Sequence, residues 1–284
     1  MNEARDVDPG TRGAAPGFLD RPVGPADPGP ALGPQLTATP GLAEIDGLVR
    51  SAWLAIVTVG AALALGIFLI DSLLPIGSHH AYKAIGGYLV LLVPVLAFLR
   101  AHRPHRRFGP ANTVTLLRAA MVCLLASLFG EAWSDLELFV ACVATVALTL
   151  DGVDGWLARL RGTQSSFGAR FDMEIDALLV LVLSLLAWQS GKAGAWVLAV
   201  GLMRYAFVAA SYAWPWLARP LPPSQRRKTV CVLELIALIA CVAPVLPDGW
   251  RTAAAVDAVL LATWSFAIDV AWLHRRRHDP AVPG

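Results

Sequence analysis

The stretch Leu150–Leu179, LDGVDGWLARLRGTQSSFGARFDMEIDALL, is decisive because four aspartates stand there at the end of one apolar segment and the start of the next. Charged residues inside apolar segments of membrane-spanning length are costly and usually functional. Asp151 and Asp154 are three residues apart and share one helix face, and Asp172 and Asp176 share a face of the following helix. A short connection makes two such helices antiparallel, so all four carboxylates are predicted to point into one pocket.

These carboxylates indicate a metal site, because they cannot all stay ionised at one place without a cation. Oxygen ligands of this kind suit Mg²⁺ or Mn²⁺, and two ions would neutralise the group while leaving coordination positions for phosphate oxygens. The helix face of Asp151 and Asp154 continues with Gly155, Ala158 and Arg159. The small residues leave room for a nucleotide against the helix backbone, and the arginine can hold a phosphate oxygen.

Apolar segments long enough to cross a bilayer recur throughout the chain from Ser51 onward. Hydrophobic residues make up 56% of the sequence and charged residues 15%, a composition typical of membrane proteins. Each segment is predicted to be a helix, because a backbone in lipid must satisfy its own hydrogen bonds. The predicted spans are Ala52–Leu74, Ala84–Leu99, Thr113–Gly130, Leu136–Ala158, Asp172–Trp188, Ala195–Leu217, Thr229–Leu246 and Thr252–Leu273. The predicted fold class is therefore an all-α polytopic membrane helix bundle.

The chain divides into four parts on composition. Residues 1–45 are rich in Pro and Gly and lack apolar periodicity, so they are predicted to form a disordered tail. Residues 46–107 hold two transmembrane helices, residues 108–275 hold six more, and residues 276–284 form a polar C-terminal tail. No signal peptide is predicted, since the first long apolar segment is long enough to span a bilayer.

Basic residues cluster in every second connection, at residues 100–107, 159–170, 219–228 and 275–277. Such clusters remain on the cytoplasmic side of a membrane, so the carboxylate pocket and both termini are predicted to face the cytoplasm. The expected location is the bacterial inner (cell) membrane. A formal net charge of only +2 does not favour a nucleic-acid partner.

The quoted stretch resembles the signature of the CDP-alcohol phosphotransferase (CDP-alcohol phosphatidyltransferase) family, D-x-x-D-G-x-x-A-R-x(8)-G-x-x-x-D-x-x-x-D. All eight fixed positions are met, by Asp151, Asp154, Gly155, Ala158, Arg159, Gly168, Asp172 and Asp176. The family's six-helix core carries this signature from its second helix into its third, which here places the core at residues 108–275 and leaves two additional helices before it. The resemblance implies a metal-dependent transfer of a phosphatidyl group from a CDP-linked lipid, with CDP-diacylglycerol as the expected donor, to an alcohol, with release of CMP.

The resemblance also implies roles for the signature residues. Asp151, Asp154 and Asp172 would bind the metal, and Asp176 would be the catalytic base that takes the proton of the attacking hydroxyl. Spacing alone does not fix which aspartate is the base, and Asp176 is also a candidate metal ligand. The residues implied to contact CDP are Gly155, Ala158, Arg159 and Gly168. A homodimer formed through core helices is a further implication.

Asn112, Thr115 and Arg118 repeat every three residues at the start of the predicted core. The family often carries a similar Asn-x-x-Thr-x-x-Arg run here, and the resemblance implies a wall of the nucleotide pocket. The alternative is structural: an asparagine N-cap, a hydroxyl bonded to its own helix backbone and an arginine at the interface.

A second group of polar residues predicts an acceptor or lipid-phosphate site. Arg226 and Lys228 open a helix on the same side as the aspartates, where they would attract an anionic lipid or a phosphorylated acceptor or simply anchor the helix. Arg204 and Glu234 lie within spans and either pair with each other or face the acceptor cavity.

Two other functions are compatible with aspartates in membrane helices. A magnesium-dependent membrane prenyltransferase also binds a diphosphate through aspartate pairs, but it does not require the spacing of Gly155, Arg159 and Gly168. A divalent-cation transporter would distribute its aspartates along a path through the bilayer, whereas these all lie toward one face. The acceptor alcohol follows no spacing rule and is left open.

Overall fold

The computed structural model describes residues 42–74, 76–77, 79–98, 108–132, 136–161 and 166–277. All regular structure in these ranges is helical, which confirms the predicted all-α fold. The α-helices of the described chain are α1 (Leu42–Leu73), α2 (His79–Phe98), α3 (Pro110–Ser127), α4 (Glu137–Arg161), α5 (Ser166–Gln189), α6 (Leu198–Ala213), α7 (Gln225–Val242) and α8 (Asp248–Arg275). Two 3₁₀ turns, η2 (Ala195–Val197) and η3 (Pro215–Ala218), flank α6.

The helices follow the predicted spans but extend beyond them at their polar ends. Helix α5 begins at Ser166, ahead of the predicted Asp172, and α7 begins at Gln225 instead of Thr229. Hydropathy marks only the apolar part of a helix, while the backbone hydrogen bonds continue into the polar turns. Helix α6 ends at Ala213, short of the predicted Leu217, because Pro215 has no backbone N–H to continue the ladder.

Some predictions fall on residues outside this description. They concern the N-terminal tail as far as residue 41, the basic connection at 100–107 and the C-terminal tail from residue 278. Residues 42–45, also assigned to the tail, belong to α1.

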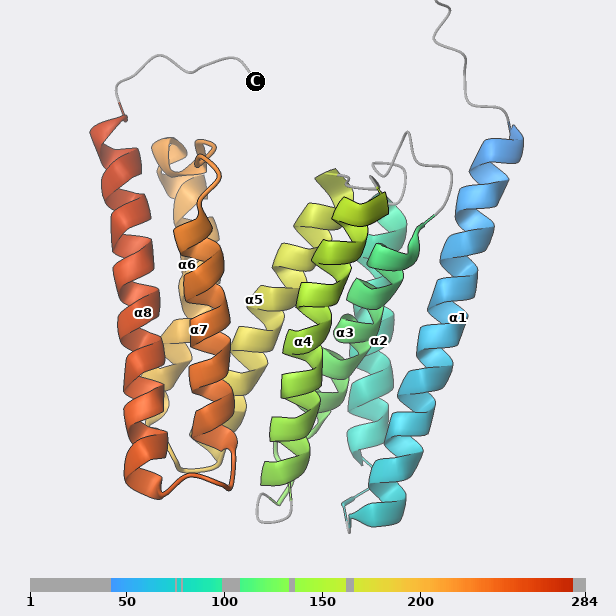
Figure 1. Ribbon diagram of the computed structural model, residues 1–284, viewed down its shortest axis with the longest axis horizontal. Helices are drawn as coiled ribbons and strands as arrows, with labels where there is room; N and C mark the ends of the chain where they lie inside the picture. The colour runs from blue at the N-terminus through green and yellow to red at the C-terminus, as the bar shows by residue number, and fades with distance from the viewer. Residues whose placement is uncertain are drawn as a thin grey trace, which may run out of the picture. The chain divides into compact units, whose positions relative to one another are not determined.

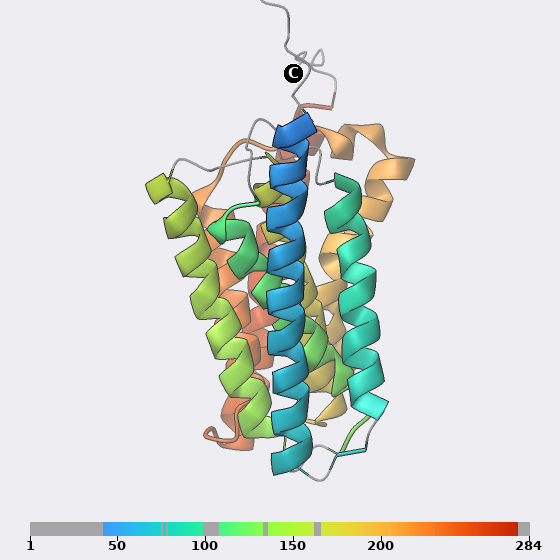
Figure 2. The same cartoon turned by 90° about the vertical axis from the view of Figure 1, so that its right-hand side faces the viewer.

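Helix α3 is the hub of the bundle and packs against α1, α2, α4 and α5 (Figures 1 and 2). Gly109 precedes it with a φ of 80°, a conformation that favours glycine, and Pro110 begins the helix with its φ already suited to it. On the other side of the bundle, α7 packs against α4, α5 and α8. The α3–α5 contact joins two helices that are not consecutive in the chain.

The two helices before residue 108 are attached to the rest through α3. An apolar cluster that includes Ile56, Ile70, Ala84 and Leu116 fills the space between them. The Tyr88 hydroxyl donates to the Ile56 carbonyl at 3.0 Å, which adds a hydrogen bond between α2 and α1.

Five described segments are long and apolar enough to cross a membrane: Gly47–Leu73, His79–Ala97, Pro110–Ser127, Ala195–Ala213 and Asp248–Arg275. Large apolar side chains such as Leu54, Phe68 and Leu260 are exposed on these helices, as expected where lipid replaces water. The chain is an integral membrane protein. The C-terminal ends of α2, α4, α6 and α8 lie at the same end of the bundle (Figures 1 and 2). In the sequence, a basic cluster lies at or after the C-terminal end of each of these helices.

The opposite end is held by a network of paired charges. Arg251 of α8 is 3.2 Å from Glu137 of α4 and 3.7 Å from Asp248. Lys192 binds the same two carboxylates, at 3.8 Å from Glu137 and 3.1 Å from Asp248. This network, called the Arg251 network below, ties the start of α8 to the start of α4.

Candidate active site

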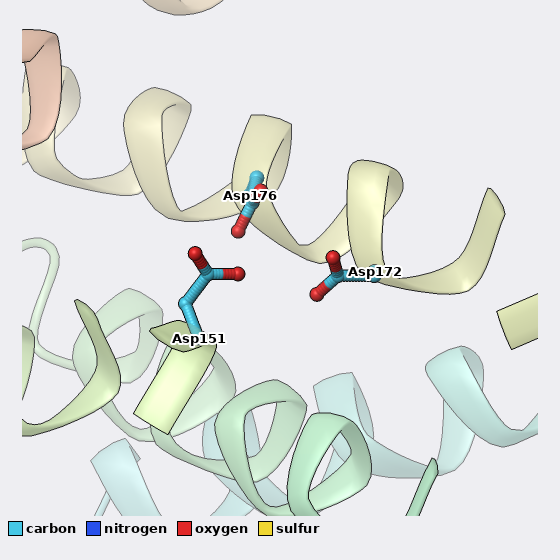
Figure 3. Close-up of side chains that lie close together, drawn as sticks. All are labelled: Asp151, Asp172 and Asp176. Carbon is cyan, nitrogen blue, oxygen red and sulfur yellow. The ribbon is translucent and has the colours of Figure 1, made fainter. Parts of the chain in front are cut away.

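Helices α4 and α5 bring three of the four predicted aspartates together. Asp151 lies in the C-terminal half of α4, and Asp172 and Asp176 lie in the N-terminal half of α5. One carboxylate oxygen from each of the three lies within 4.8 Å of the others. Figure 3 shows the three carboxylates directed toward a common point between the two helices. We call Asp151, Asp172 and Asp176 the acidic triad.

Arg118 of α3 lies at the centre of the acidic triad. Its Nη1 is 2.9 Å from Oδ1 of Asp151 and also donates to Oδ1 of Asp172, while its Nη2 donates to Asp176. Its Nε donates to the Ala147 carbonyl at 3.1 Å. The Arg118 side chain has no exposed surface, whereas those of the three aspartates are 25%, 36% and 21% exposed. The guanidinium therefore meets the carboxylates from the protein interior, and the carboxylates remain accessible from outside.

The other signature residues lie on the same two helices. Asp154, Ala158 and Arg159 belong to α4, and their side chains lie outside the described part of the structure. Gly155 of α4 and Gly168 of α5 are half-buried. The backbone thus places the complete signature on α4 and the start of α5.

Asn112 and Thr115 lie on α3 and are both buried. The Asn112 amide donates to the Phe108 carbonyl, and the Thr115 hydroxyl donates to the Ala111 carbonyl at 3.1 Å. The N-cap of α3 is Gly109, so the alternative interpretation of Asn112 as the N-cap was wrong. Their predicted contact with the nucleotide stays a prediction.

A cavity of about 620 Å³ adjoins the triad, in the size range of small-molecule sites. Residues of α5, α6, α7 and α8 and of the 221–224 connection line it, and we call it the α5–α8 cavity. Asp176 borders it, together with Arg204, Lys228 and Glu234, three of the predicted acceptor-site residues. Most of the remaining lining is apolar, including Val180, Val200, Phe207 and Phe266.

A close contact between α5 and α6 shapes this cavity. A Cβ atom on Gly201 of α6 would lie 2.5 Å from Cα of Leu181 and 2.6 Å from Oγ of Ser184, both on α5. The glycine therefore allows the two helices to approach closely.

The charged residues around the cavity have partners that the sequence did not reveal. Arg204 pairs with Glu174 of α5 and not with Glu234, so the predicted alternative of an Arg204–Glu234 pair was wrong. Glu174 lies between Asp172 and Asp176, and its spacing of two from each directs it to another helix face. That spacing was a usable signal for a contact with a neighbouring helix.

Arg226 is turned toward α8. It donates to the Ser265 hydroxyl at 2.8 Å and to Asp269, and its guanidinium carbon is 5.6 Å from the ring centroid of Trp264. Arg227, which lines the cavity, is 3.5 Å from the same aspartate. Asp269 is a buried residue of α8. Its pairing depends on the packing of α7 against α8.

The donor set of the triad is suited to a divalent metal. Its three carboxylates offer hard oxygen ligands, which Mg²⁺ and Mn²⁺ prefer. Among the described side chains, the three carboxylates are paired with one guanidinium, that of Arg118, so these four groups together carry excess negative charge. The residues present therefore fit a divalent cation at this place.

Comparison with known proteins identifies one family. The family model described as CDP-alcohol phosphatidyltransferase matches residues 108–268 of the 284. The matched region begins just before α3 and ends within α8, so it contains the acidic triad and every lining residue of the α5–α8 cavity except Asp269. The search of curated proteins and the search of solved structures returned no match.

Proposed function

The chain belongs to the CDP-alcohol phosphatidyltransferase family, and from this premise we propose that it transfers a phosphatidyl group from CDP-diacylglycerol to an alcohol in a metal-dependent reaction that releases CMP. The family is one of membrane transferases for substituted phosphate groups, with a CDP-alcohol donor and an alcohol acceptor. Family members generally depend on divalent metals, and the acidic triad agrees with this dependence. Family membership removes the prenyltransferase and transporter alternatives.

One observation carries the proposal: Asp176 belongs to the acidic triad and also borders the α5–α8 cavity. A group in this position can act on a molecule in the cavity while the reacting phosphate lies at the triad. We therefore propose that the cavity receives the acceptor and that Asp176 is the base. Its carboxylate takes the proton of the acceptor hydroxyl, the hydroxyl oxygen forms a bond to the β-phosphorus of the donor, and the bond from that phosphorus to the CMP oxygen breaks.

The metal ligands in this proposal are Asp151, Asp154, Asp172 and Asp176, with two Mg²⁺ or Mn²⁺ ions as the expected complement. When bound, the ions would polarise the diphosphate and stabilise the negative charge of the departing CMP. The carboxylates would keep the ions at the interface of α4 and α5, where the donor phosphates would bind.

The proposed nucleotide contacts are those of the signature and of α3. Gly155 and Ala158 lack bulk on the helix face of Asp151, and Arg159 supplies a cation for a phosphate oxygen. The further residues in this proposal are Gly168, Asn112, Thr115 and Arg118.

The α5–α8 cavity supports an acceptor that carries a phosphate. Arg204, Arg227 and Lys228 line it, and Lys228 lies in the first turn of α7, where a helix favours anions. Glu234 supplies a carboxylate deeper in α7 that can accept a hydrogen bond from an acceptor hydroxyl. For Arg226, the bonds to Ser265 and Asp269 favour a role in joining α7 to α8.

The active site and both termini are proposed to face the cytoplasm of a bacterial inner membrane. The support is that a basic cluster lies at or after the C-terminal end of α2, α4, α6 and α8 in the sequence, and that these helix ends lie at one end of the bundle. Labelling of a cysteine at position 277 from outside intact cells would contradict a cytoplasmic C-terminus.

A homodimer through the core helices is proposed from the family alone.

The test of the function uses purified protein, radiolabelled CDP-diacylglycerol and a panel of acceptors. Glycerol phosphate and inositol phosphate represent phosphorylated acceptors, and glycerol, inositol and serine are their matched uncharged or zwitterionic controls. We expect CMP release and a labelled phospholipid with a phosphorylated acceptor. Product with the uncharged alcohols alone would contradict the phosphate proposal, and no CMP release with any acceptor would contradict the donor.

A further inference from the structure

Arg118 is a buried cation whose neighbours are the proposed metal ligands. Its side chain has no exposed surface, so its charge has lost its contact with water and depends on carboxylates for compensation. It obtains this from all three members of the acidic triad at once, through Nη1 and Nη2. The contacts join α3 to both α4 and α5.

The guanidinium contacts an oxygen of each of the three carboxylates that form the proposed metal site. Nη1 contacts Oδ1 of Asp151 and Oδ1 of Asp172 together. A Mg²⁺ ion with ligands at about 2.1 Å keeps any two of them within about 4.2 Å of each other. Candidate ligand oxygens of the triad already lie within 4.8 Å of one another. An ion that bridged the Oδ1 atoms of Asp151 and Asp172 would need the space of this nitrogen.

We infer that Arg118 is the resident counter-ion of the acidic triad and competes with divalent cations for its carboxylates. In this role it stabilises the α3–α4–α5 contact when no metal is bound, and a metal ion binds by taking carboxylate oxygens from the guanidinium. The inference rests on the proposed function, because it takes the triad as the metal site.

Electrostatics gives the sign of the effect on metal binding. A guanidinium within a few ångströms of a dication repels it, and such an interaction is worth a tenfold or larger change in affinity at the effective dielectric constants of protein interiors. Arg118 should therefore weaken metal binding while it stabilises the metal-free protein. A contact of Arg118 with the donor diphosphate requires the side chain to leave the triad first, since it is fully buried there.

The experiment compares wild type with Arg118→Gln and Arg118→Lys in detergent. Manganese affinity is read from the EPR signal of free Mn²⁺, and melting temperature is measured in EDTA and in MnCl₂. Arg251→Gln is the matched control, because Arg251 is also a buried arginine paired with carboxylates but lies in the Arg251 network at the other end. Asp172→Asn reports whether the triad is the metal site.

We expect Arg118→Gln to melt below wild type in EDTA, to bind Mn²⁺ about tenfold more tightly and to gain more stability from it. Arg118→Lys keeps the positive charge, so it should remain folded. Because a lysine cannot reach three carboxylates, this variant should bind Mn²⁺ more tightly than wild type, but by a smaller factor than Arg118→Gln. Arg251→Gln should melt lower with unchanged Mn²⁺ affinity. Equal or weaker Mn²⁺ binding in both Arg118 variants overturns the inference. Identical Mn²⁺ binding by wild type and Asp172→Asn instead overturns the proposed metal site.

Discussion

Arg118 and Arg251 are two buried arginines on opposite sides of the bundle's midplane. They differ in the ratio of carboxylates to cations around them. Arg118 contacts three aspartates on two helices, and it is the one cation that the described side chains place among them. Arg251 shares two carboxylates, Glu137 and Asp248, with a second cation, Lys192. The Arg251 network is balanced, while the described side chains at the acidic triad comprise three carboxylates and one guanidinium.

We interpret this difference as the one between a structural charge cluster and a cluster that binds metal. A balanced cluster requires no further ion and contributes to stability by holding helix ends together. A cluster with excess carboxylate is less stable without a cation and so has affinity for one. Changes at the triad should therefore act mainly on metal binding and activity, and changes in the Arg251 network should act mainly on stability.

The largest expected effect is that of Asp172→Asn on activity. Loss of a charged ligand should lower kcat/KM for CMP release by at least about 100-fold at ordinary magnesium concentrations. The melting temperature in EDTA should stay equal or rise, because one of three neighbouring acids becomes neutral. Steady-state kinetics and melting curves on the same preparation measure both quantities.

Near-normal CMP release by Asp172→Asn would contradict a catalytic role of its carboxylate. Asp151→Asn should behave in the same way, since both carboxylates contact the same guanidinium nitrogen. If both variants release CMP normally, the acidic triad does not hold the catalytic metal.

Glu137→Gln should give the opposite pattern. It removes one carboxylate from a nearly buried Arg251 and should lower the free energy of unfolding by about 2 kcal/mol. The kcat and KM of the folded fraction should remain within about twofold of wild type. A variant of normal stability and strongly reduced kcat would show that the two ends are not functionally separate.

Gly155→Ala should give the smallest effect, a rise of a few-fold in the donor KM before kcat falls, because a methyl group mainly obstructs ground-state binding of the nucleotide. Gly152→Ala is the matched control on the same helix, where an added Cβ would meet nothing within 4 Å. Donor titrations and melting curves are needed for both variants. A Gly155→Ala protein that melts well below wild type with a normal KM would make this glycine a helix-packing residue.

The sequence was sufficient to predict the helices and the gathering of the carboxylates. Apolar length identifies the spans, and the helical spacing of Asp151 on one helix and Asp172 and Asp176 on the next brings them together across a short connection. These signals are local or involve consecutive helices. The match of the family to residues 108–268 agrees with the signature-based prediction.

The partners of the arginines could not be predicted in the same way. Arg118 reaches the triad because α3 packs against α4 and α5, and Arg226 reaches Asp269 because α7 packs against α8. Which faces meet depends on side-chain packing over the whole bundle, for which the sequence has no simple period. The prediction of Arg118 as a nucleotide contact therefore did not include its position among the carboxylates of the acidic triad.

We propose that the acidic triad holds the catalytic divalent metal of this CDP-alcohol phosphatidyltransferase. The most direct test of this proposal is CMP release from CDP-diacylglycerol by purified wild-type protein that has been treated with EDTA and then titrated with Mg²⁺ or Mn²⁺. We expect no release in EDTA and full recovery on addition of metal, with Asp172→Asn failing to recover. Release in EDTA at the same rate as with metal would contradict the proposal.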